Sequence, residues 1–159
     1  MYLRTPIGPL LSLLNPADDC NKLLQVTGFD KDMEATCMLM ANILHETCNL
    51  KYLKELADGW AYEYRSDLGN DQPGDGPKYK GAGVLQLTGK HNYTRLCSAI
   101  GDSRIMEGVD YVADVYPFRS AETWIKENHL LDCAQQKGFE SVCVRINGGW
   151  NGYDDRLAK

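Results

Sequence analysis

A concentration of glycine and proline in the middle of the chain constrains the fold more than any other sequence feature. Seven of the 17 residues from 67 to 83 are glycine or proline, a density that interrupts both helices and strands. Irregular loops of this length inside a compact domain commonly carry function. Because helical patterns lie on both sides of this window, the sequence predicts one mainly helical domain, residues 1–159, with a large central loop.

The clearest helix is predicted for residues 31–46, with Asp30 or Asp32 as its cap. Apolar residues recur there at steps of three and four along one presumed core face: Met33, Cys37, Met40, Ala41 and Leu44. Helices are also predicted for four further segments: 49–66, 91–100, 120–130 and 139–146. Residues 1–30 are expected to form a short helical lead-in and a loop, and residues 84–88 a strand or extended segment.

Composition excludes several classes of protein. The chain has 159 residues, a net charge of −5, 43% hydrophobic and 25% charged residues, which is ordinary for a globular domain. The acidic balance argues against nucleic acid as a partner, because phosphate binding depends on clustered lysine and arginine. No run approaches the roughly 18 apolar residues of a membrane span.

Six cysteines raise the question of disulfides or a metal site. None of them is spaced as C-x-x-C, so a zinc ribbon or thioredoxin motif is not expected. The apolar run Leu10–Leu14 is short, lies between prolines and is followed by no small-residue cleavage site, so it does not read as a signal peptide. We therefore expect mostly reduced cysteines, packed as small hydrophobic residues.

Glu46 is the first candidate for chemistry. It ends an apolar helix, and a carboxyl held against apolar surface has a raised pKa, which suits a general acid. His45 precedes it, but the second histidine of an H-E-x-x-H zinc helix is missing. The alternative is an ordinary surface glutamate at a helix end.

A second carboxylate would have to face Glu46. Glu55 follows nine residues later and Glu63 seventeen residues later, and either could do so if the chain turns. An inverting glycosidase holds its two carboxyls roughly 6.5–9.5 Å apart, with a water between them. The alternative for Glu55 is a surface partner of Lys51 or Lys54.

Two further segments combine glycines with polar side chains. Residues 81–89 carry Gln86 and Thr88 in an apolar run, with Asn92 just beyond, and such amides and hydroxyls suit sugar recognition. The glycine spacing fits neither G-x-G-x-x-G nor G-K-[ST], so a nucleotide loop is not expected. Residues 145–156 read either as a helix stop with a solvated charge cluster or as a saccharide-binding rim, since aromatic rings stack on sugar faces.

These pieces, in this order, resemble the family 19 glycoside hydrolases, which include plant-type chitinases and many phage endolysins. The resemblance covers about residues 33–157. Four motifs carry it: His45-Glu46-Thr47, Gly81 to Gly89 with Asn92-Tyr93, Ile146-Asn147-Gly148-Gly149, and Asp154-Asp155-Arg156. The resemblance implies a mostly α-helical, lysozyme-like fold and an inverting mechanism that needs two carboxylates and no cofactor or metal.

Carried over by motif, Glu46 resembles the general acid. The spacing in the endolysin-like branch selects Glu55 as the general base, whereas the plant branch would point to Glu63; Glu55 is preferred. Thr88 matches the residue that holds the attacking water. The resemblance assigns substrate contacts to His45, Gln86, Asn92, Tyr93, Asn147 and Arg156, the last of which also orients the carboxylates. Cys48 and Ala82 depart from the family pattern, which commonly has glycine and arginine there.

The expected substrate is bacterial peptidoglycan, cleaved at the β-1,4 bond between its amino sugars. A leaderless chain without a plant-type disulfide framework favours a monomeric phage endolysin or bacterial murein hydrolase. Such an enzyme is made in the bacterial cytoplasm and acts in the periplasm or cell wall after release. Chitin, with the same linkage, is the alternative substrate, and a non-catalytic glycan-binding relative is the alternative of another class. The net charge of −5 stands against an anionic substrate.

Overall fold

The computed structural model describes residues 15–159, and within this range it is helical with no β-strand. The α-helices are α1 (Pro16–Thr27), α2 (Met33–Glu46), α3 (Asp75–Lys78), α4 (Lys90–Ile100), α5 (Val109–Val115), α6 (Glu122–Glu127), α7 (Leu130–Asn147) and α8 (Tyr153–Leu157). Short 3-10 turns link several of them. The predicted mainly α fold class is confirmed. No helix in this range is both long and apolar enough to span a membrane.

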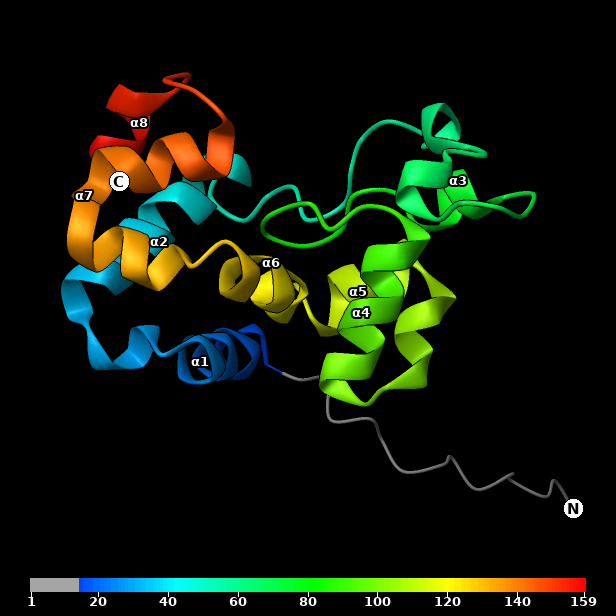
Figure 1. Cartoon of the computed structure of the whole chain (residues 1–159), viewed down its shortest axis with the longest axis horizontal. Coiled ribbons are helices and arrows are strands. Elements are labelled where there is room, and N and C mark those ends of the chain that lie inside the picture. Colours follow the sequence, from blue (N-terminus) through cyan, green and yellow to red (C-terminus); the bar gives the residue numbers. More distant parts are fainter. Residues whose placement is uncertain (1–14) are drawn as a thin grey trace, which may run out of the picture.

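The helices form two lobes (Figure 1). One lobe contains α1, α2, α6, α7 and α8, and the other contains α3, α4 and α5. Each lobe has its own apolar core, the first including Leu39, Ile43 and Ile125, and the second including Tyr93 and Leu96. Two segments, before and after α3, run between the lobes. An isolated bridge of Lys54 to Ala82 joins them, and a bridge of Ala82 to Leu87 lies within the second segment.

Helix α2 forms where it was predicted, but its buried face was predicted wrongly. Asp32 caps it by accepting a hydrogen bond from the Ala35 amide at 3.0 Å. Met33 is 77% exposed and Cys37 is exposed as well. The buried residues are Ala35, Leu39, Asn42 and Ile43. Because apolar residues surround this helix, its pattern allowed two faces, and packing against α7 and α8 chose between them.

The helix predicted for residues 49–66 is absent. Cys48, Asn49 and Leu50 have φ values of 49°, 61° and 66°, so the chain leaves α2 through three consecutive left-handed residues. An extended segment follows, in which Lys54 bridges to Ala82, and then a 3-10 turn at Trp60–Tyr62. Leu56, an apolar residue of this segment, is 80% exposed. Apolar spacing predicted a helix, but backbone hydrogen bonds to residues 81–83 hold residues 53–55 extended.

The remaining element predictions are confirmed in position, with two exceptions. The segment 84–88 is neither a strand nor extended, because residues 83–86 form a turn that the bridge of Ala82 to Leu87 closes. Helices α4 and α7 end at Gly101 and Gly148, both left-handed, as the sequence indicates. The segment 120–130 is not one helix, because α6 ends at Glu127 and α7 starts after His129, whose φ is 47°. Of the predicted lead-in, α1 is present, and residues 1–14 lie outside the described residues.

The six cysteines all lie within the described range and none is in a disulfide. Cys133 and Cys143 are buried, Cys20 and Cys97 are partly buried, and Cys37 and Cys48 are exposed. The prediction that they mostly pack as buried residues is therefore correct for only part of the set.

Candidate active site

Glu46, the last residue of α2, is held by a buried arginine. Arg156 of α8 donates from Nη2 to Glu46 Oε1 at 2.6 Å and from Nη1 to Asn42 Oδ1 at 2.9 Å. The Arg156 side chain is 1% exposed, whereas that of Glu46 is 30% exposed. Asn42 and Glu46 lie one helical turn apart on the same face of α2, so one guanidinium reaches both and leaves the second carboxyl oxygen of Glu46 free for other contacts.

Glu46 faces a small pocket of about 130 Å³. The other residues lining it are Leu85, Gln86, Trp124 and Ile146. The apolar surface expected beside the Glu46 carboxyl is therefore present on one side. The Arg156 guanidinium lies on the other side. The sequence argument for an apolar environment of Glu46 did not include this charge.

A second pocket of about 270 Å³ shares Leu85, Gln86 and Trp124 with the first. We call the two pockets together the groove. The second pocket is also lined by Leu68, Leu87, Thr88, Asn92, Arg95, Ser120, Ala121, Thr123 and Glu127. Most of these residues come from α4, α6 and the chain between α3 and α4, while Leu68 precedes α3, and Ser120 and Ala121 lie in the 3-10 turn before α6. The groove therefore lies between the two lobes and has a polar lining suited to sugar hydroxyls.

Glu55 is the better placed of the two candidate second carboxylates. Its Oε1 accepts a hydrogen bond from the Tyr62 hydroxyl at 2.9 Å, and its Oε2 accepts one from the Gly81 amide at 2.8 Å. The hydrogen bond to this carboxylate, together with burial, raises the pKa of the Tyr62 phenol. A Cβ on Gly81 would lie 2.5 Å from Gln86 Oε1 and 3.0 Å from Glu55 Oε2. Gln86 and Glu55 therefore meet over Gly81, where only glycine leaves room.

Glu63 is bound into the loop of residues 67–83 instead. Its two carboxyl oxygens accept hydrogen bonds from the amides of Gly74, at 2.7 Å, and Gly76, at 2.9 Å. Like Glu55, it is not among the residues lining either pocket of the groove, but unlike Glu55 it has no contact with Gln86 or its neighbour Gly81. This geometry gives Glu63 a role in holding the loop.

Gln86, Thr88 and Asn92 lie together along the groove. Thr88 Oγ1 donates to the Gln86 carbonyl at 2.9 Å, and Asn92 Nδ2 donates to the Thr88 carbonyl at 2.8 Å. Gln86 has φ 55°, a left-handed conformation in which its amide also bonds back to the Gly83 carbonyl. The strained turn presents these three side chains on one wall.

The other predicted substrate contacts lie elsewhere. Tyr93 is fully buried and donates to the Lys80 carbonyl at 2.7 Å, and burial raises its pKa; the prediction of a direct glycan contact is wrong because the core encloses the ring. His45 Nδ1 pairs with Asp155 at 2.7 Å, and this contact lowers the pKa of Asp155. Asn147 Nδ2 donates to the Gly149 carbonyl at 3.2 Å at the end of α7. Neither His45 nor Asn147 lines the groove pockets.

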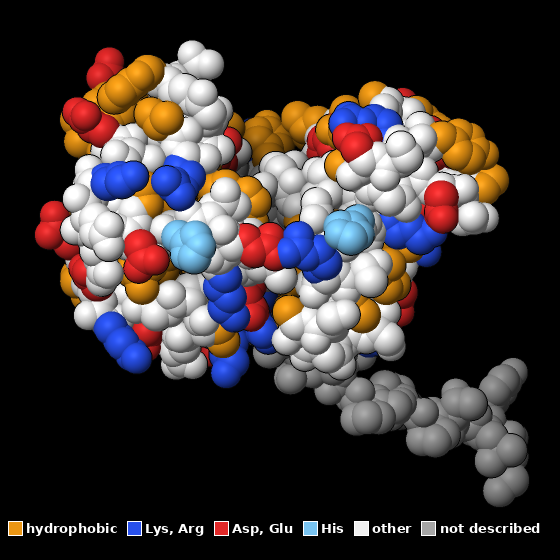
Figure 2. All heavy atoms as spheres, viewed as in Figure 1, with side chains coloured by type: hydrophobic (Ala, Val, Ile, Leu, Met, Phe, Trp, Pro, Cys, Tyr) orange, Lys and Arg blue, Asp and Glu red, His pale blue; other side chains and the backbone are white. Residues whose placement is uncertain are grey.

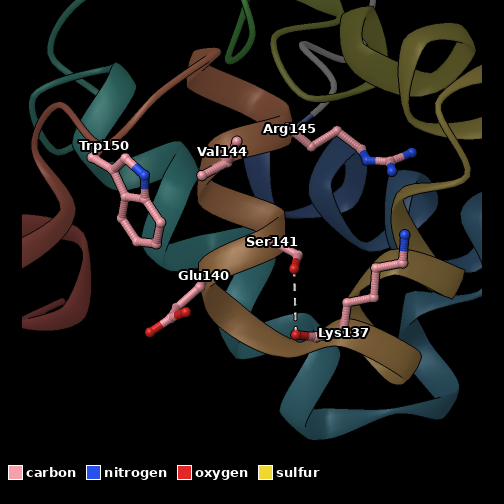
Figure 3. A pocket seen from close by; sticks show the side chains of 6 residues that line it. All are labelled: Lys137, Glu140, Ser141, Val144, Arg145 and Trp150. Carbon is pink, nitrogen blue, oxygen red and sulfur yellow. Dashed lines mark hydrogen bonds between the residues drawn. The ribbon is translucent and has the colours of Figure 1, made fainter.

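Another pocket, of about 370 Å³, lies along α7 (Figure 3). Lys137 and Arg145 point to one side of the helix, while Trp150 and Glu140 lie on the other. Ser141 donates to the Lys137 carbonyl within the helix. Because these polar groups do not converge on a common point, the chemistry is better placed in the groove beside Glu46.

Several residues of the site were missed by the sequence argument, one behind the Glu46 carboxyl and three in the groove. Asn42 carried a usable signal, since it lies four residues before Glu46 on a predicted helix. Trp124, Arg95 and Glu127 carried none, because they reach the groove only through the packing of α4 and α6. No three histidine, cysteine, aspartate or glutamate side chains of residues 15–159 are grouped as a metal site would require.

Comparisons with known proteins identify the class of this fold. Chitinase C from Streptomyces griseus HUT6037 matches with a TM-score of 0.64 and 19% identity, over 92% of this chain and 67% of that chain. A mutant of chitinase C matches with a TM-score of 0.60 and 20% identity, over 88% of this chain and 78% of that chain. The fold is therefore the helical, lysozyme-like fold of chitinases.

Sequence similarity narrows this class further. The chain is 35% identical over 102 residues to a glycosyl hydrolase family 19 domain-containing protein of Haemophilus influenzae, a match that covers 64% of this chain and 49% of that protein. The chain thus spans about half the length of that relative. No family model matches the sequence. Together with the motifs in their order, the match to this relative confirms the resemblance to the family 19 glycoside hydrolases.

Proposed function

We propose that the protein is an inverting glycoside hydrolase that cleaves the β-1,4 bonds between the amino sugars of peptidoglycan. One observation carries the proposal: Gln86 lies between two carboxylates that are each held by oriented donors. It lines the pocket of Glu46, and its amide oxygen lies beside Gly81, which donates to Glu55. Acid–base glycoside hydrolysis needs two positioned carboxylates, one for each face of the scissile bond, and Glu46 and Glu55 are two such groups next to one side chain, Gln86.

In this mechanism Glu46 donates a proton to the leaving glycosidic oxygen. Glu55 takes a proton from the water that attacks the sugar from the opposite face, and Thr88 holds this water. Arg156 and Asn42 fix the Glu46 carboxyl, while Tyr62 and the Gly81 amide fix that of Glu55. Gln86 and Asn92 bind the sugar amide and hydroxyl groups. Both lobes contribute to this groove, and we treat them as one catalytic domain.

Peptidoglycan is the proposed substrate, and the enzyme would act on the bacterial cell wall as endolysins do. Chitin is the second candidate, because the solved structures similar to this chain are named as chitinases. The two polymers share the β-1,4 amino-sugar linkage, so the same carboxylate pair could act on either.

A set of isosteric variants tests the roles. Purified protein is added to outer-membrane-permeabilised Gram-negative cells, and the digested murein is analysed by mass spectrometry. We expect Glu46→Gln and Glu55→Gln to lower the rate at least 100-fold, a typical acid–base contribution. Glu63→Gln, which disturbs only the loop, should retain hydrolysis with a lowered melting temperature.

Other outcomes would reject parts of the proposal. Equal clearing by wild type and Glu46→Gln would exclude catalysis by Glu46. Loss of activity in Glu63→Gln but not in Glu55→Gln would reassign the base. Cleavage of chitin oligomers without cleavage of murein would select chitin, and glycan binding without hydrolysis by wild type would indicate a non-catalytic relative. Proton NMR of the first product should show the inverted anomer.

A further inference from the structure

An ion pair crosses the groove in the part that does not touch Glu46. Arg95 of α4 and Glu127 at the end of α6 form this pair, and both line the larger pocket of the groove. Helices α4 and α6 belong to different lobes, and Figure 2 shows acidic and basic side chains in contact between the lobes on this face. The pair therefore joins the two walls of the groove.

Arg95 is the one cation among the described residues that line the groove, where the other charged groups are Glu46 and Glu127. The chain as a whole has a net charge of −5. An anionic ligand would therefore be repelled by most of the protein but attracted at Arg95. In the groove, the charge of Arg95 is balanced by its ion pair with Glu127.

This pair is easily exchanged. The Arg95 and Glu127 side chains are 41% and 45% exposed, and ion pairs with this exposure contribute little net stability. Glu127 is the last residue of α6, where the helix dipole disfavours a carboxylate. A guanidinium binds any carboxylate through two parallel hydrogen bonds. A carboxylate on a ligand can thus replace Glu127 at small cost.

We propose that Arg95 determines specificity by selecting glycan chains that carry carboxylates, which displace Glu127 when they enter the groove. This inference rests on the proposed function and narrows its substrate class to anionic amino-sugar chains, such as murein strands with peptide carboxylates. A neutral chain offers no replacement for Glu127 and leaves the guanidinium paired across the groove. The pair therefore discriminates between two polymers that share one linkage.

The experiment compares one substrate in two charge states. Soluble murein strands are used either intact or after their carboxyls have been converted to neutral amides. Binding is measured by titration calorimetry in the Glu46→Gln background, so that hydrolysis does not interfere, and hydrolysis by otherwise wild-type protein is measured in parallel. The readout is the ratio of affinities for intact and amidated strands.

We expect Arg95→Ala to lower this ratio about tenfold, a usual size for a charge-assisted contact. Glu127→Gln should raise affinity for intact strands, because the competing carboxylate is gone. Arg104→Ala is the matched control, since Arg104 pairs with Glu107 at similar exposure, 44% and 57%, outside the groove; it should keep the ratio.

Each contrary result is decisive. Equal affinity losses for both strand forms in Arg95→Ala would mean that Arg95 only shapes the groove. A ratio near one in the Glu46→Gln background, or no binding of either form, would also overturn the inference. Binding that follows the expected ratios without any hydrolysis by wild type would reject the proposed function and leave the role of Arg95 in binding supported.

Discussion

Arg156 shows how one side chain connects packing with chemistry. It is 1% exposed and still charged, and a buried guanidinium is tolerated only when its donors are satisfied. Its contacts to Asn42 and Glu46 satisfy two of them, and both partners lie on α2. The residue is thus a positioning residue: it joins α8 to α2 and fixes the proposed acid.

Replacing Arg156 by lysine should separate charge from geometry. Lysine keeps the charge, but its single ammonium cannot reproduce the fork that reaches Asn42 and Glu46 together. We expect kcat to fall about tenfold to 100-fold with little change in KM, measured on protein shown to be folded at the assay temperature. If Arg156 acts through Glu46, Arg156→Lys should cause no further loss in a Glu46→Gln background. If the double variant loses kcat by the product of the two single-variant effects, Arg156 does not act through Glu46.

Asp19 provides a second prediction at the scale of a single residue. Its side chain is buried, Oδ2 accepts hydrogen bonds from the amides of Phe118 and Arg119, and Oδ1 has no partner among the described residues. Burial raises the pKa of Asp19 to about 6. The folded state therefore binds this proton more tightly than the unfolded state, and the contribution to stability falls as pH rises from about 4 to about 6.

Denaturant unfolding at pH 4, 5, 6 and 7 would measure this effect. Asp19→Asn should remove the Asp19 part of the pH dependence, up to about 3 kcal/mol across this window. Asp18→Asn, which changes an exposed neighbour, should keep the wild-type profile. If Asp19→Asn keeps it as well, Asp19 does not titrate in this range.

Among the structural elements, the turn after α2 is the least expected. Three consecutive residues, Cys48, Asn49 and Leu50, are left-handed, and none is glycine. This conformation costs roughly 1–2 kcal/mol for residues with a Cβ, less for asparagine. The strain lies directly after Glu46 and turns the chain toward Glu55. Family members commonly have glycine at the position of Cys48, and its φ of 49° supplies the physical reason.

Cys48→Gly should therefore raise the free energy of unfolding by up to about 1 kcal/mol, after the entropy cost of glycine is deducted. Cys37→Gly is the matched control, because Cys37 is also exposed but lies inside α2. Its replacement should lower stability by about 0.5 kcal/mol. Chemical denaturation would measure both changes in the free energy of unfolding. A gain for Cys48→Gly with a loss for Cys37→Gly would support strain at Cys48, and a loss in both variants would refute it.

The same turn shows the limits of prediction from sequence. Helices that end in glycine, at Gly101 and Gly148, are predicted correctly because a local signal ends them. The structure of residues 49–66 is not predicted correctly, because Cys48 and Leu50 carry no local signal for a left-handed backbone. In the site, the motifs predict the groove residues Glu46, Gln86, Thr88 and Asn92, but Arg95 and Trp124 enter the groove only through contacts between distant helices.

For the whole molecule, the decisive segment is the one that joins the two cores. Ala82 belongs to the core of the lobe with α4, and Val84 belongs to the core of the lobe with α2. Gly83 lies between them, with its amide bonded to the Leu53 carbonyl at 2.7 Å. The chain thus passes from one core to the other within three residues, immediately before Leu85 and Gln86 line the groove.

Gly83→Ala tests whether this crossing holds the molecule together. A Cβ on Gly83 would lie 2.6 Å from the Pro117 carbonyl oxygen and 2.7 Å from Ser120 Cβ, neither of which is a flexible end. Gly101 has nearly the same φ, 80° against 76°, but nothing within 4 Å of its Cβ position. Gly101→Ala should cost about 1 kcal/mol from backbone strain alone, whereas Gly83→Ala should cost at least about 3 kcal/mol because overpacking adds to it. Denaturant unfolding compares the two free energies. Equal losses would show that the lobes can shift apart at Gly83 without penalty, and a larger loss at Gly83 would show that the groove depends on this crossing.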